Sequence, residues 1–63
     1  MREFTFEVRF YPARGGREVN GPDVGRLHIP AESETAARRS GVDYLHQQGL
    51  FAERMTLETV KEM

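Results

Sequence analysis

The stretch Phe4-Thr5-Phe6-Glu7-Val8-Arg9-Phe10-Tyr11 alternates apolar and polar residues without a break. This period of two is typical of a β-strand that buries one side and wets the other. The apolar side consists of Phe4, Phe6, Val8 and Phe10, and the polar side of Thr5, Glu7, Arg9 and Tyr11. We therefore expect residues 2–11 to form a strand whose apolar side is the surface on which the rest of the chain packs.

The chain is short, with 63 residues and no cysteine. It is predicted to be one domain over residues 1–63, near the lower limit for independent folding, with neither disulfides nor a thiolate metal site to reinforce it. Dimerisation is the natural stabiliser left, because subunit contacts add buried surface without lengthening the chain. The chain contains nine Lys and Arg residues and ten Asp and Glu residues. This balance argues against bulk nucleic acid or an anionic membrane as a whole-surface partner.

Turn residues dominate the segment 12–25, which holds four glycines, two prolines and the pair Asn20-Gly21. Such residues adopt backbone angles that others resist, so we expect a flexible hairpin loop over 12–25. A short second strand follows over 25–30. Its residues Leu27 and Ile29 face the core, and Pro30 is typical of an edge strand or a strand end.

A single helix is predicted over about 34–48. Ser33 is placed to cap its N-terminus, and Gly49 fits the left-handed position that ends helices. The inward stripe is expected to comprise Ala37, Ser40, Gly41, Tyr44, Leu45 and Gln48, with Arg38 on the water side. Glycine inside a helix costs about 1 kcal/mol relative to alanine. A close approach of Gly41 to the phenylalanine side of the first strand would offset that cost.

The C-terminal segment 52–63 leaves two alternatives open. As a strand it places Met55 and Leu57 on one side, and a bulge near Thr59 brings Val60 to that side. As a helix it has an apolar stripe too short to be stable alone. The β-branched threonines favour the strand.

These elements predict an α+β domain with the order ββαβ. The expected sheet is mixed, with three strands in the order 2-1-3, and the helix packs on one face. We expect a right-handed crossover that brings the third strand beside the first and parallel to it. The sheet face turned away from the helix, called the open face below, and both edge strands would then be uncovered.

The candidate binding residues are those of the open face and the hairpin loop. They are Thr5, Glu7, Arg9, Tyr11, Arg14, Arg17, Arg26 and His28. An open face or edge strand predicts a protein-interaction module, binding either a second copy or another protein. The alternative is nucleic-acid binding, in which the arginines bind phosphates and a base stacks on Tyr11. Against that, Arg9 can pair with a carboxylate such as Glu7 or Glu58.

Catalytic and cofactor motifs are not apparent in the sequence. It holds no Ser/His/Asp set, no cysteine nucleophile and no glycine-rich phosphate loop. His28 and His46 fall on different predicted elements, so we expect no metal site. We predict a non-enzymatic protein without cofactor or small-molecule substrate. No signal peptide or apolar run near 18 residues is seen, and we expect a cytoplasmic protein with no membrane contact.

Two resemblances bear on fold and role. Val8-Arg9-Phe10-Tyr11, followed by Ala13-Arg14 and Arg17-Glu18, resembles the opening strand and turn of β-grasp sulfur-carrier proteins. This resemblance implies a compatible strand-strand-helix-strand order. Carriers act through a C-terminal Gly-Gly, whereas this sequence ends in Lys61-Glu62-Met63, so their activity is not implied. In size and arginine content the chain is similar to small proteins of actinobacterial phages and mobile elements, which implies binding to a host protein.

Overall fold

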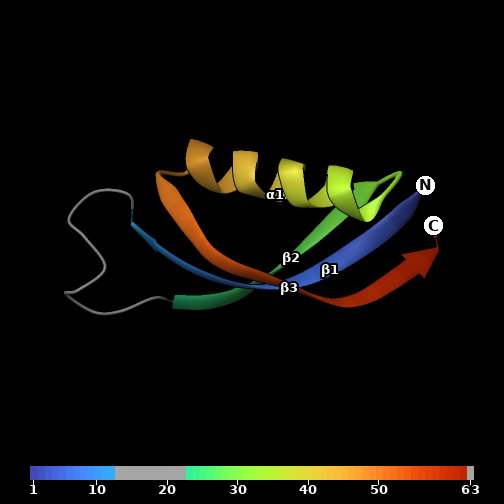
Figure 1. Ribbon diagram of the computed structural model, residues 1–63, viewed down its shortest axis with the longest axis horizontal. Coiled ribbons are helices and arrows are strands. Elements are labelled where there is room, and N and C mark those ends of the chain that lie inside the picture. The colour runs from blue at the N-terminus through green and yellow to red at the C-terminus, as the bar shows by residue number, and fades with distance from the viewer. Residues whose placement is uncertain (13–22, 63) are drawn as a thin grey trace.

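The computed structural model describes residues 1–12 and 23–62. The elements follow in the order β1 (Arg2–Pro12), β2 (Asp23–Ala31), α1 (Glu34–Gln47) and β3 (Leu50–Glu62). The strands form one sheet in the order β2-β1-β3, and α1 lies on one of its faces (Figure 1). The α+β class and the 2-1-3 strand order predicted from the sequence are confirmed.

The sheet is antiparallel throughout, because β1 runs opposite to both β2 and β3. The predicted mixed sheet, with the third strand parallel to the first, is therefore wrong. Two strands of one sheet that are joined by a helical crossover run parallel to each other. Those strands are β2 and β3, and they lie on either side of β1 rather than next to each other.

The core lies between α1 and the apolar side of β1. Phe4, Phe6 and Val8 are at most 3% exposed. They pack with the buried residues Ala31, Ala37 and Leu45 and with half-buried apolar residues of all three strands. Complete burial of such side chains contributes roughly 1.5–3 kcal/mol each. The apolar alternation of β1 therefore forms the core, as predicted.

Both predicted ends of the helix are confirmed. The hydroxyl of Ser33 accepts a hydrogen bond of 3.2 Å from the N–H of Ala36, which would otherwise lack a helical partner. At the other end Gly49 has a φ of 75°, the left-handed conformation that glycine adopts at no steric cost. Gln47 is the last helical residue, one position earlier than expected.

Gly41 brings the helix close to the sheet, although not to the phenylalanines. A Cβ atom at this position would lie 2.8 Å from Cδ1 of Ile29 and 2.9 Å from Cε of Met55. The close approach is therefore to side chains of β2 and β3, which meet over β1. The expected inward stripe is too wide: Tyr44 is 51% exposed, and Ser40 and Gln48 are also exposed.

The C-terminal segment is a strand, which decides between the two alternatives. The pairing of β1 with β3 shifts register twice, and each shift leaves one extra residue in β3: Glu58 at the first and Glu53 at the second. An extra residue of this kind is a β-bulge. The shift at Glu58 places Val60 opposite Phe4, as the predicted bulge near Thr59 required, but Val60 is 46% exposed and does not join the core.

Candidate protein-interaction surface

Six of the predicted binding residues share the open face. Thr5, Glu7, Arg9 and Tyr11 occupy alternate positions of β1, opposite to its buried side. Across the ladder, His28 pairs with Thr5 and Arg26 with Glu7. No element among the described residues covers this face. The other two predicted residues, Arg14 and Arg17, lie outside the described part of the chain, as does most of the predicted loop 12–25.

The two bulge glutamates pair with Arg9 and Arg26 on the open face. Arg26 reaches across β1 to Glu58, with 2.7 Å from Nε to Oε1 and 3.4 Å from Nη2 to Oε2. This hydrogen bond, and then the charge of Glu58, raise the pKa of Arg26. Arg9 lies 3.7 Å from Glu53. The pairing of Arg9 with a cross-strand carboxylate is therefore confirmed, and the partner is Glu53 of β3 rather than Glu7 or Glu58.

Charge on the open face is balanced among the described residues. The acidic positions are Glu3, Glu7, Glu53 and Glu58, and the basic positions are Arg9, Arg26, Arg54 and Lys61. Four charges of each sign sum to zero. A surface that grips phosphates needs an excess of positive charge. The open face lacks that excess in the described part of the chain.

A hydrogen bond and an aromatic stack also lie on the open face. The Thr5 hydroxyl and Nδ1 of His28 share a hydrogen bond of 3.0 Å. At the end of the sheet nearest residue 12, the rings of Tyr11 and Phe51 stack with centroids 5.5 Å apart and planes 17° apart. Phe51 was not predicted as a surface residue of interest, and it is 48% exposed.

The outer edge of β3 is obstructed. Its two bulges interrupt the regular row of backbone groups, which is a known protection of sheet edges. In addition, Nη1 of Arg38 donates a hydrogen bond of 2.9 Å to the carbonyl oxygen of Met55. The guanidinium also lies 5.1 Å from the centroid of the Phe6 ring. Arg38 was expected on the water side, but its long side chain instead bends over the core to β3.

The outer edge of β2 is regular. The position of Pro30 in the pairing shows which backbone groups point outward from this edge. Pro30 pairs with Glu3, yet proline has no N–H to donate. A hydrogen-bonded pair needs an N–H from both residues, so Glu3–Pro30 is a non-hydrogen-bonded pair, and the Pro30 backbone faces outward. Inward and outward residues alternate along the strand. The N–H and C=O groups of the alternate residues Val24, Arg26 and His28 then point away from β1. The pairing of β1 with β2 has no register shift that would interrupt this row.

The same alternation can be checked at β3. If Glu3 turns its backbone groups toward β3, then Val8–Met55 is a non-hydrogen-bonded pair. The Met55 carbonyl must then point outward, which is where the Arg38 guanidinium meets it. The inference from Pro30 and the observed Arg38 contact therefore agree.

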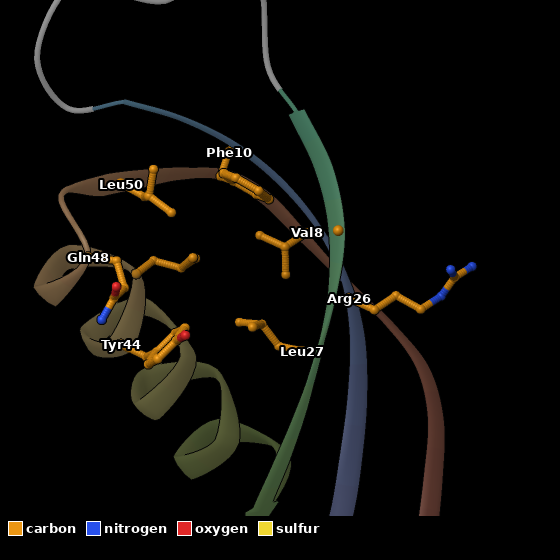
Figure 2. A pocket seen from close by; sticks show the side chains of 9 residues that line it. Val8, Phe10, Arg26, Leu27, Tyr44, Gln48 and Leu50 are labelled. Carbon is orange, nitrogen blue, oxygen red and sulfur yellow. The ribbon is translucent and has the colours of Figure 1, made fainter.

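An apolar groove runs between α1 and β2. It consists of two adjoining hollows of about 350 and 380 Å³, and Leu27 and Tyr44 line both. Figure 2 shows the hollow nearer the C-terminal end of α1, with Leu27 and Tyr44 turned toward it and Arg26 turned away. Ile29 and Gly41 line the other hollow. The groove therefore lies directly beside the regular edge of β2.

Within residues 1–12 and 23–62, no three His, Asp or Glu side chains gather as a metal site would require. The helix in this part of the chain is neither long nor apolar enough to cross a bilayer. Comparisons with protein-family models, with curated proteins and with solved structures gave no match.

Proposed function

We propose that this protein is a small non-enzymatic interaction module that accepts a strand from a protein along the outer edge of β2. The observation that carries the proposal is the regular row of outward backbone groups at Val24, Arg26 and His28 beside an apolar groove. In strand addition, main-chain hydrogen bonds supply affinity, and alternate side chains entering neighbouring pockets supply specificity. We also propose that it acts in the cytoplasm, because the chain holds no disulfide that would point to an oxidising compartment.

The two sides of an added strand would meet different surfaces. Alternate side chains on one side would enter the groove next to Leu27 and Tyr44, both of which have apolar surface left to cover. Those on the other side would extend the open face beside Arg26 and His28. The groove would therefore select apolar residues and the open face polar ones, the alternation of an ordinary strand.

Nucleic acid is the less well supported ligand. Arg9 and Arg26 already pair with Glu53 and Glu58, so contact with phosphates would first have to break those ion pairs. A retarded complex at low salt that weakens steeply as salt rises would be the signature of nucleic-acid binding.

Photo-crosslinking in the natural host cells tests the proposal. A benzophenone side chain replaces Tyr44 in the groove, and a control chain carries it at Arg39, on the exposed side of the helix. We expect a discrete protein adduct from position 44 and none from position 39. His28→Pro removes one outward N–H and should abolish the adduct. His28→Val also loses the imidazole but keeps the N–H, and it should preserve the adduct. An adduct that forms equally in both variants would contradict strand addition at β2.

A further inference from the structure

We infer that the strand added to β2 is β2 of a second copy of this chain, so that the protein is a two-fold symmetric dimer with one continuous sheet of six strands. This inference rests on the proposed function and names its partner. It is carried by the self-complementarity of the β2 edge and by the position of Tyr44 on the helix.

The residues of β2 match one another when two copies run antiparallel. In a two-fold interface each contact occurs twice, so a pair of residues i and j is accompanied by the pair j and i. With Leu27 on the axis, Arg26 pairs with His28 of the second copy, and Val24 pairs with Pro30. The outward N–H groups of Val24, Arg26 and His28 then all meet carbonyls, and in these pairs only the Val24 carbonyl, opposite the missing N–H of Pro30, lacks a donor.

The two neighbouring registers are poorer. An axis at Arg26 sets two guanidinium groups directly opposite each other, and like charges in that position are destabilising. An axis at His28 sets Arg26 opposite Pro30, which puts the missing donor near the centre of the ladder. The register about Leu27 avoids both defects and keeps the helix-covered faces of the two copies on the same side of the sheet.

Tyr44 fits the space between the two helices. α1 contacts both β2 and β3, and it therefore lies above β1. In the joined sheet the two β1 strands are three strand spacings apart, roughly 14 Å. Helices in direct contact lie only about 8–10 Å apart, so large side chains must fill the remaining gap. Tyr44 projects on the β2 side of the helix and is 51% exposed in the single chain.

A second copy would also cover apolar side chains that the single chain leaves partly exposed on the β2 side. Leu27 and Ile29 are only half-buried, whereas Phe4 and Phe6 of β1 are buried. On the β3 side Arg38 closes over the core, but the groove on the β2 side has no such cover among the described residues. A 63-residue chain without disulfides gains most from a partner that covers this side.

Sedimentation equilibrium of the full chain tests the inference. We expect a mass near twice 7.2 kDa for the native sequence and for His28→Val. His28→Pro loses one N–H per subunit and places a ring in the interface, so its dissociation constant should rise by about tenfold or more. Tyr44→Glu, which buries a charge between the helices, should also yield monomers. Far-UV circular dichroism confirms that each variant is folded.

The outcomes separate this inference from the proposed function. A folded native monomer at every concentration would overturn the dimer, and it would leave the proposed function standing if the crosslink from position 44 reaches another protein. A dimer unchanged in both His28→Pro and Tyr44→Glu would show that another surface joins the copies, which also overturns the inference. A monomer with no edge-dependent crosslink would overturn both proposals.

Discussion

Phe6→Ala is expected to leave the chain largely unfolded at 25 °C. Phe6 is fully buried at the centre of the core, and truncation of a buried phenylalanine to alanine costs about 3–5 kcal/mol. A core of this size supplies a net stability of only about 3–5 kcal/mol. The substitution therefore removes most or all of the free energy of unfolding. Urea titration followed by circular dichroism, at a low fixed protein concentration, measures the loss.

Phe51→Ala is the matched control, because Phe51 is 48% exposed and packs against Tyr11 at the end of the sheet. The same truncation there removes surface that is already half in water, and we expect a folded chain with a small loss of stability. If Phe6→Ala kept a cooperative transition close to that of the native chain, the phenylalanine side of β1 would not be the core.

Gly41→Leu is expected to destabilise the chain by forcing α1 off the sheet. The Cβ atom alone would lie closer to Ile29 and Met55 than real contacts allow, and a leucine adds three more carbons. Overpacking of this kind costs typically about 1–3 kcal/mol. Leucine is a better helix former than glycine, so part of the cost is offset by about 1 kcal/mol of helix propensity.

Asp43→Leu separates the two effects. Asp43 is exposed on the same helix, so leucine there improves helix propensity without meeting the sheet. We expect this variant to match or exceed the native stability in thermal unfolding, while Gly41→Leu melts lower. Equal melting temperatures for the two variants would show that the contacts at Gly41 do not hold the helix in place.

Local patterns were sufficient to predict β1 and α1. The alternation from Phe4 to Tyr11 identified both sides of β1, because a period of two needs no knowledge of the partner strands. Ser33 and Gly49 located the ends of the helix, since capping depends on backbone groups within a few residues. The open face of β1 and β2 followed from the same alternation.

Features that depend on partner strands could not be predicted. The bulges at Glu53 and Glu58 appear only when β3 is paired with β1, and they decide which carboxylates meet Arg9 and Arg26. The antiparallel direction of β3 is different, because it follows from the order of the elements: the helical crossover makes β3 parallel to β2, and the hairpin makes β2 antiparallel to β1. Arg38 was misplaced because helical periodicity locates its Cα but not the end of a long side chain.

Amide hydrogen exchange, measured residue by residue, tests most directly whether the edge of β2 is the interaction surface. The amide of Leu27 faces β1 and should be protected in every state, so it serves as the internal reference. We predict that the amides of Arg26 and His28 are protected at high protein concentration and lose that protection on dilution. The amide of Met55, on the outer edge of β3, should exchange rapidly throughout. Rapid exchange of Arg26 and His28 at every concentration, or concentration-dependent protection of Met55 instead, would contradict a dimer joined along β2.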